Sequence, residues 1–270
     1  MIKIVLDAGH GPKVPGKRTP KFEDGSFMHE HEFNNSVVNK LKPKLDATGK
    51  FEVTIVSSDS VDVPLSQRVA KERSIKSDLF LSVHANALSN NWGNPKGIES
   101  FFNSTSTLGP KYASIIQENL IKDTGLVNRG AKSAPGPQYP TSLYVLKNTY
   151  GPAVLVECGF MDNKDEARLL MSDEYRETIA QSLFKSICNI FKVVVEEKGF
   201  KIVNTPTSTI EQMKQWAINR KANQLFINLA ETFYNVAKKI GCDPTVVYAQ
   251  SAKETGFMRF GGVIDATYHN

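Results

Sequence analysis

The sequence predicts an α/β fold: a twisted, largely parallel sheet with helices on both faces, followed by a small all-α segment at the carboxyl end. Over residues 1–191, short apolar runs alternate with longer stretches of helical periodicity. Several of the runs are apolar throughout, which is typical of strands that helices cover on both sides. After about residue 207, only helical periodicity is left.

The elements can be assigned in order along the chain. We expect strands at 2–6, 51–56, 78–85, 97–102, 142–146 and 153–158, helices at 30–45, 64–75 and 109–125, and a closing helical region at 165–191. The first helix has Phe33, Val37, Leu41 and Leu45 on one face. Proline opens the second helix, and glycine follows the third.

The periodicity breaks at 193–207, so we expect a first domain at 1–192, a linker at 193–207 and a helical segment at 208–270. Ser208 and Glu211 fit a capping box at the start of that segment. A second helix should run to Gly241, and Asp243–Pro244 should open a third. The expected core residues of this segment are Trp216, Leu225, Phe226, Leu229 and Phe233.

Composition excludes several classes of protein. The chain has 270 residues, a net charge of +5 and a sequence pI near 8.9, but its basic residues are scattered among acidic ones, so we expect no nucleic-acid partner. Three widely spaced cysteines argue against a disulfide framework or a cysteine zinc site. No apolar run is long enough for an integral membrane segment, and the amino terminus has no export-signal pattern.

Two histidines follow apolar strands of the same type: His10 in "LDAGHG" and His84 in "LSVHANA". In an open α/β sheet, ligands bind outside the carboxyl ends of the strands. If the two strands are parallel neighbours, the imidazoles meet there and could hold a metal. A polar residue at the rim of the sheet is the alternative interpretation of His10.

A third ligand should come from "HEHEF", where Glu30 is favoured because it begins the amphipathic helix four residues before Asn34. We expect its neighbours His29, His31 and Glu32 to belong to a solvated helix start.

Glu157 interrupts the apolar strand "AVLVECGF". A buried carboxylate is costly unless it is paired or lies at a site. An ion pair with Arg68 or another basic residue is the structural alternative to a catalytic role.

"LDAGHG", Glu30-x-x-x-Asn34, "LSVHANA" and "VLVECGFMDN" occur in this order over residues 1–191. Together they resemble the zinc-dependent N-acetylmuramoyl-L-alanine amidases of bacterial autolysins and phage endolysins. The resemblance implies Zn²⁺ as cofactor, His10, Glu30 and His84 as its ligands, and Glu157 as the catalytic carboxylate. It implies a structural role for the helix that contains Arg68.

The chemistry that this resemblance implies is hydrolysis of the amide between N-acetylmuramic acid and L-alanine. Zinc would lower the pKa of water to about 7, and Glu157 would act as general base. The expected partner is bacterial peptidoglycan. Without an export signal, we expect the protein to be made in the cytoplasm and to reach the wall after phage or mother-cell lysis. A zinc peptidase acting on wall peptides and a non-catalytic wall-binding module are the alternatives.

Two features depart from the simple family pattern. The segment at 12–29, rich in proline, glycine and lysine, is either a wall of the substrate groove or a surface loop. The tail "VVYAQSAKETGFMRFGGVIDATYHN" resembles the beginning of a glucosaminidase domain, with Glu254 in the place of its acid. In the alternative interpretation, "KETG" is a helix end capped by Gly256. We expect this segment to be incomplete as a glycosidase.

Overall fold

The computed structural model describes residues 1–194 and 206–258. Contacts divide the chain into two compact units, Met1–Val195 and Glu196–Asn270, which are described separately below. Most of the expected linker at 193–207 and the last twelve residues of the tail lie outside the described residues. No helix in the described ranges is both long and apolar enough to cross a membrane.

The first unit contains a six-stranded sheet in the order β2-β1-β3-β6-β4-β5. The strands are β1 (Ile2–Ala8), β2 (Phe51–Ile55), β3 (Leu79–Asn86), β4 (Ile98–Phe102), β5 (Asn128–Ser133) and β6 (Ala153–Phe160). All neighbouring pairs are parallel except β4 and β6, which are antiparallel. The expected fold class, with its largely parallel sheet, is confirmed.

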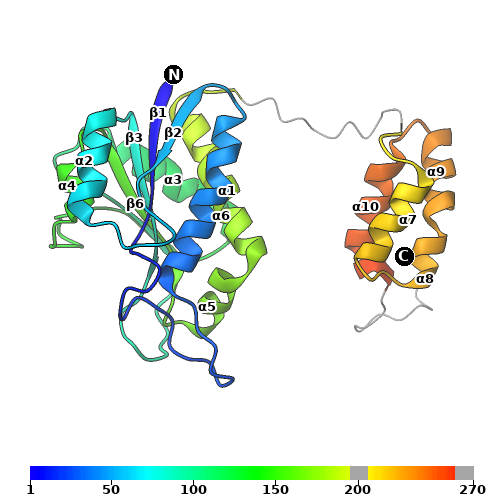
Figure 1. Cartoon of the computed structure of the whole chain (residues 1–270), viewed down its shortest axis with the longest axis horizontal. Helices are drawn as coiled ribbons and strands as arrows, with labels where there is room; N and C mark the ends of the chain where they lie inside the picture. Colours follow the sequence, from blue (N-terminus) through cyan, green and yellow to red (C-terminus); the bar gives the residue numbers. More distant parts are fainter. Residues whose placement is uncertain (195–205, 259–270) are drawn as a thin grey trace. The chain divides into compact units, whose positions relative to one another are not determined.

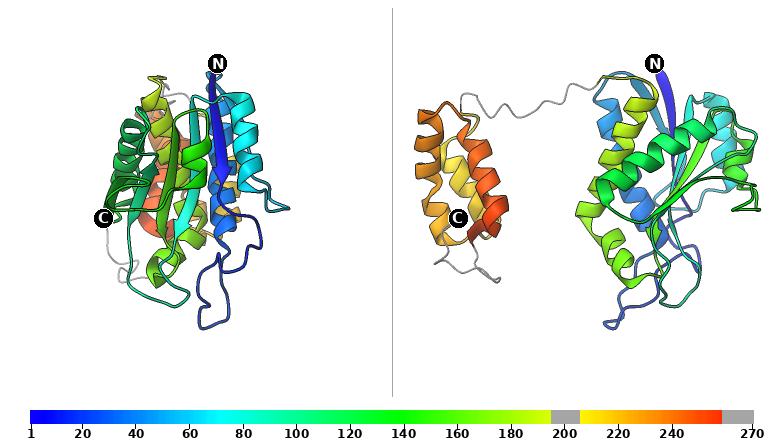
Figure 2. Two further views of the ribbon diagram at one scale, coloured as in Figure 1. Left: turned by 90° about the vertical axis from the view of Figure 1, so that its left-hand side faces the viewer. Right: turned by 180° about the vertical axis from the view of Figure 1, so that it is seen from behind.

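Helices cover both faces of this sheet (Figures 1 and 2). One face carries α1 (Glu30–Asp46), α3 (Gly109–Thr124) and α6 (Asp173–Ile190), whose apolar residues share a core with alternate residues of the strands. The other face carries α2 (Leu65–Ile75) and α4 (Tyr144–Asn148) over a smaller core. Helix α5 (Lys164–Met171) follows β6. Because β1, β3 and β6 are parallel neighbours, their carboxyl ends lie together at one end of the sheet.

One expectation for this unit was wrong, and one strand was not expected. The run at 142–146 was expected to be a strand, but α4 occupies most of it, because a short apolar run also suits a buried helix whose Val145 and Leu146 pack into the smaller core. Strand β5 was missed because "NRGAKS" is an edge strand without an apolar run. The expected helical region at 165–191 is confirmed and consists of two helices, since Ser172 ends α5 and caps α6.

The second unit is helical: α7 (Ile210–Asn219), α8 (Gln224–Asn228), α9 (Ala230–Lys239), α10 (Pro244–Thr255) and the short η1 (Gly256–Met258). Asp243 caps α10, as expected, but the capping box of α7 is formed by Thr209 and Gln212 rather than by Ser208 and Glu211.

The core of this unit differs in part from the expected one. Phe226 is buried, and Trp216 and Phe233 pack against the cluster. Leu225 is exposed and Leu229 only partly buried, because their positions turn away from the cluster. Tyr248, which the expected core omitted, is buried and stacks on Phe226 with the ring centroids 4.4 Å apart.

Candidate metal centre

His10 lies two residues beyond β1, in a backbone conformation that is uncommon for a residue with a side chain. Its φ is 59°, in the left-handed region. The guanidinium of Arg68 donates from Nη2 to the carbonyl of His10 at 2.7 Å and holds this turn. Gly9 is packed against His84: a Cβ at Gly9 would lie 2.5 Å from Nδ1 of His84 and closer to two other ring atoms. The sequence Gly9–His10 is therefore needed for the two imidazoles to meet.

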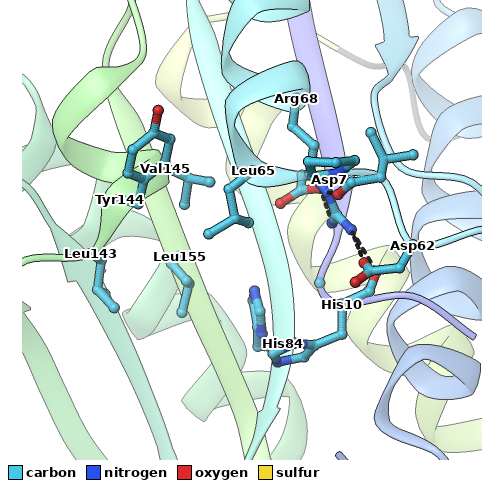
Figure 3. Close-up of a pocket in the computed structure, with 13 residues that line it drawn as sticks. Asp7, His10, Asp62, Leu65, Arg68, His84, Leu143, Tyr144, Val145 and Leu155 are labelled. Atoms are coloured by element: carbon cyan, nitrogen blue, oxygen red, sulfur yellow. Dashed lines mark hydrogen bonds and ion pairs between the residues drawn. The ribbon is translucent and has the colours of Figure 1, made fainter. Parts of the chain in front are cut away.

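The parallel pairing of β1 and β3 places Ala8 beside Val83, so His10 and His84 emerge from neighbouring strands. Their ring centroids are 5.1 Å apart (Figure 3). Glu30, the first residue of α1, reaches between them: Oε1 is 3.0 Å from Nδ1 of His84, and Oε2 is 3.2 Å from Nε2 of His10. The three side chains offer one ligand atom each, all within 4.8 Å of one another.

Glu30 is buried and held from several directions. Its Oε1 accepts from the backbone N–H of Ala85 at 3.3 Å and from Nδ2 of Asn34 at 3.4 Å. Burial alone would raise the pKa of Glu30, but the hydrogen bonds and charges of His10 and His84 outweigh burial and hold it below its ordinary value. Burial likewise opposes ionisation of His84, yet Glu30 raises the pKa of this imidazole. Without a metal, the cluster therefore favours a proton between the carboxylate of Glu30 and the imidazole of His84.

A divalent cation suits this cluster. Each oxygen of Glu30 faces a ring nitrogen at hydrogen-bond distance, and two bare acceptors at such a distance require a proton or a cation between them. Two imidazoles and one carboxylate are a donor set that zinc uses in catalytic sites, with a further position open to water or substrate. Because metal ligands must be deprotonated, a bound cation would replace the proton that the cluster otherwise favours.

Glu157 lies beside this cluster on β6, with its Cα paired to that of His84 in the sheet register. Its Oε2 is buried and has no hydrogen-bond partner among the residues that the structure describes. Burial first, and then the charges of Glu30 and Glu99, raise the pKa of Glu157 to about 8, although His84 acts in the opposite direction. A carboxylate that lines a cavity next to a candidate metal centre, with one oxygen buried and unpartnered and a raised pKa, is typical of a functional site.

The alternative ion pair between Glu157 and Arg68 does not occur. Arg68 is 1% exposed and pairs instead with Asp7 at 2.8 Å and Asp62 at 3.2 Å, as Figure 3 shows. It also donates to the carbonyls of Val63, Ala8 and His10.

Two cavities adjoin the imidazoles of His10 and His84. One, of about 390 Å³, also contains Glu30 and Glu157 and is otherwise lined mainly by polar residues, with Lys17 and Tyr139 among them. The other, of about 270 Å³, extends toward α2 and α4 along apolar side chains, among them Leu65, Tyr144 and Leu155 (Figure 3). Gly16 and Lys17 belong to the segment at 12–29, so part of that segment lines the site.

The neighbours of Glu30 are only partly as expected. His29 precedes α1, and its backbone N–H donates to Glu32 at 2.9 Å, which fits a helix start. His31 was expected to be solvated, but it is 3% exposed and its Nδ1 lies 3.1 Å from the carbonyl of Gly9. The reason is that the first turn of α1 packs the side that contains His31 against the carboxyl end of β1.

Glu254 lies in the second unit, near the end of α10, and is exposed. It accepts a hydrogen bond from Gln250 at 2.6 Å, and Gly256, with a φ of 56°, caps the helix. The interpretation of "KETG" as a capped helix end thus describes the local geometry.

Several residues of the site were not expected from the sequence. Gly9, Asp7 and Ser82 surround the histidines, while Lys17 and Tyr139 line the polar cavity. One signal was available: Ser82 lies two residues before His84, and alternate residues of a strand face the same side. Lys17 and Tyr139 come from irregular segments that give no such signal.

Comparison with known proteins gives consistent matches over the first unit. Residues 4–189 match the family described as N-acetylmuramoyl-L-alanine amidase. The chain is 31% identical to the N-acetylmuramoyl-L-alanine amidase LytC of Bacillus subtilis, over 70% of this chain but only 35% of LytC. It is 33% identical to the endolysin of Bacillus phage SPP1, over 74% of this chain and 70% of that protein. Among solved structures, the catalytic domain of CwlV, an amidase of Bacillus (Paenibacillus) polymyxa var. colistinus, matches with a TM-score of 0.63 and 28% identity, over 72% of this chain and 100% of that domain.

Proposed function

The chain belongs to the N-acetylmuramoyl-L-alanine amidase family, and on this premise we propose that it hydrolyses the amide between N-acetylmuramic acid and L-alanine in bacterial peptidoglycan. The observation that supports this proposal most directly is the arrangement of His10, Glu30 and His84 around one point, with Glu157 facing the same cavity. The bacterial cell wall is accordingly the proposed place of action.

We propose that His10, Glu30 and His84 hold a zinc ion. The ligands come from two strand ends and a helix start, all fixed by the packing of the first unit. A zinc ion here would supply a Lewis acid for the scissile carbonyl and would lower the pKa of water.

Glu157 would serve as the proton carrier. Its carboxylate, which lines the same cavity as the proposed zinc ligands, would take a proton from the attacking water, and the water oxygen would form the new bond to the lactyl carbonyl carbon. The bond from that carbon to nitrogen would then break, and Glu157 would return the proton to the leaving amine of L-alanine. The products would be a lactyl carboxylate and a peptide with a free amino terminus.

The test is a digest of purified peptidoglycan by the full chain. We expect new amino termini on L-alanine without new reducing ends. New amino termini on other residues would indicate a zinc peptidase, and binding without any release would indicate a wall-binding module.

We propose that the second unit, from the resemblance of its tail, corresponds to the beginning of a glucosaminidase domain. Glu254 is exposed and hydrogen-bonded within its own helix, whereas the acid of a glycosidase works in a cleft with a second carboxylate or an assisting substrate group. We therefore expect no glycosidase activity from these residues. Reducing ends that the full chain releases and Glu254→Gln abolishes would contradict this expectation.

A further inference from the structure

A buried chain of hydrogen bonds connects Arg68 to the second imidazole of the proposed metal centre. Arg68 Nη1 lies 2.8 Å from Oδ1 of Asp7, and Oγ of Ser82 lies 2.7 Å from Oδ2 of the same carboxylate. Ser82 Oγ is also 3.1 Å from Nε2 of His84. Arg68, Asp7 and Ser82 are each no more than 1% exposed. Bulk solvent therefore does not reach these three side chains.

The direction of each hydrogen bond follows from counting protons. Asp7, paired with a guanidinium, is an acceptor at both oxygens. The hydroxyl of Ser82 has one proton, which it must donate to Asp7, because a carboxylate can give nothing in return. Ser82 Oγ is then an acceptor toward His84, and Nε2 of His84 must carry the hydrogen.

This assignment decides which nitrogen of His84 is available to a ligand. With the hydrogen on Nε2, the nitrogen that can present a bare lone pair is Nδ1, which faces Oε1 of Glu30 at 3.0 Å. The same guanidinium also acts on His10, since Nη2 holds the carbonyl of that residue at 2.7 Å in its left-handed turn. Such a conformation is unfavourable for a residue with a Cβ.

We propose that Arg68, Asp7 and Ser82 form a positioning chain that prepares both histidines for the metal: it fixes His84 in the Nε2–H tautomer, with Nδ1 as the ligand atom, and it holds the backbone turn of His10. The inference rests on the zinc site of the proposed function. Partners that orient metal-bound histidines commonly contribute 10- to 100-fold to metal affinity. The helix of Arg68 thus has a function at the metal centre besides its structural role.

The test compares Ser82→Ala with Ser100→Ala in the full chain. Ser100 is a matched control, because it is also fully buried in a strand and donates to a side chain, that of Gln117, at 2.8 Å, but it has no hydrogen bond to a histidine. Zinc affinity is measured by competition with a chelator, and folding by thermal denaturation. We expect Ser82→Ala to bind zinc about 10- to 100-fold more weakly, while Ser100→Ala binds as the wild type does. Equal affinities for Ser82→Ala and the wild type would overturn the proposal.

A second measurement needs no variant. Long-range proton–nitrogen correlation spectra of the zinc-loaded wild type, with ¹⁵N-labelled histidine, report which ring nitrogen of His84 carries a hydrogen. We expect the hydrogen on Nε2, and a hydrogen on Nδ1 would overturn the assignment even if Ser82→Ala failed to fold. Neither readout depends on turnover: a protein that shows both effects but releases no L-alanine termini would contradict the proposed function and leave the positioning chain intact.

Discussion

Replacing Gly9 by alanine tests the geometry of the metal centre with a single methyl group. The new Cβ would lie 2.5 Å from Nδ1 of His84 and nearer to two other atoms of the ring, whereas ordinary contact begins at 3.4 Å. The ring must therefore retreat by about 1 Å or more. The backbone of Gly9 is not in the left-handed region, so the substitution adds contact strain but no conformational strain.

A displacement of this size should separate His84 from Glu30 and His10. We expect zinc affinity to fall about 10- to 100-fold, as when histidine ligands lose their orientation, and amidase activity to fall by about 10² or more. Chelator competition measures the affinity, and Gly93→Ala is the control, because the nearest atom to a Cβ there, Cδ of Pro95, is 3.3 Å away. A Gly9→Ala protein that folds and binds zinc like the wild type would show that the close packing of Gly9 on His84 does not position this imidazole for the metal.

Further predictions concern the metal, Glu157 and the second unit. Chelation should abolish activity and zinc should restore it, whereas His10→Ala should lose both metal and turnover; full activity in protein verified as metal-free would refute this. Glu157→Gln should retain zinc but lose about 10² to 10⁴ in rate, and a variant with most of its activity would mean that another group is the base. In metal-free protein, burial raises the pKa of Glu157 from 4.5 to about 8, so the folded state keeps a proton that the unfolded state loses. The contribution of this group to the free energy of unfolding is therefore fully present below pH 4.5 and is lost as the pH rises through about 8. The loss is at most about 1.4 kcal/mol per pH unit. Denaturant unfolding as a function of pH should show a smaller loss for Glu157→Gln. A shortened chain ending at Val194 should release L-alanine termini from purified peptidoglycan as the full chain does, since the core of the first unit lies within it; loss of all activity would show that the second unit is required.

The sequence was sufficient to predict the fold class, because nearly every strand and helix of the first unit has a clear hydrophobic period. It failed where contacts decide the structure. Residues 144–148 form helix α4, which packs against α2, and β5 exists only through its pairing with β4. Neither feature can be derived from local periodicity.

The candidate ligands could be found from the sequence because each one marks the end or start of a regular element. His10 and His84 follow strands, and Glu30 begins α1. The residues that orient them could not be found in this way. Arg68 is 58 positions from His10 and reaches it only through the packing of α2 on β1, and His31 is buried because α1 turns it toward Gly9. Such contacts depend on tertiary structure.

The most direct test of the proposed zinc site is a crystal structure of the full chain with zinc, with anomalous scattering recorded at the zinc edge. We expect one strong anomalous peak in the first unit, bonded to His10, Glu30 and Nδ1 of His84, with Glu157 beside it and not bonded to it. A peak at other residues, or no peak in protein shown to be active, would contradict the proposed zinc site.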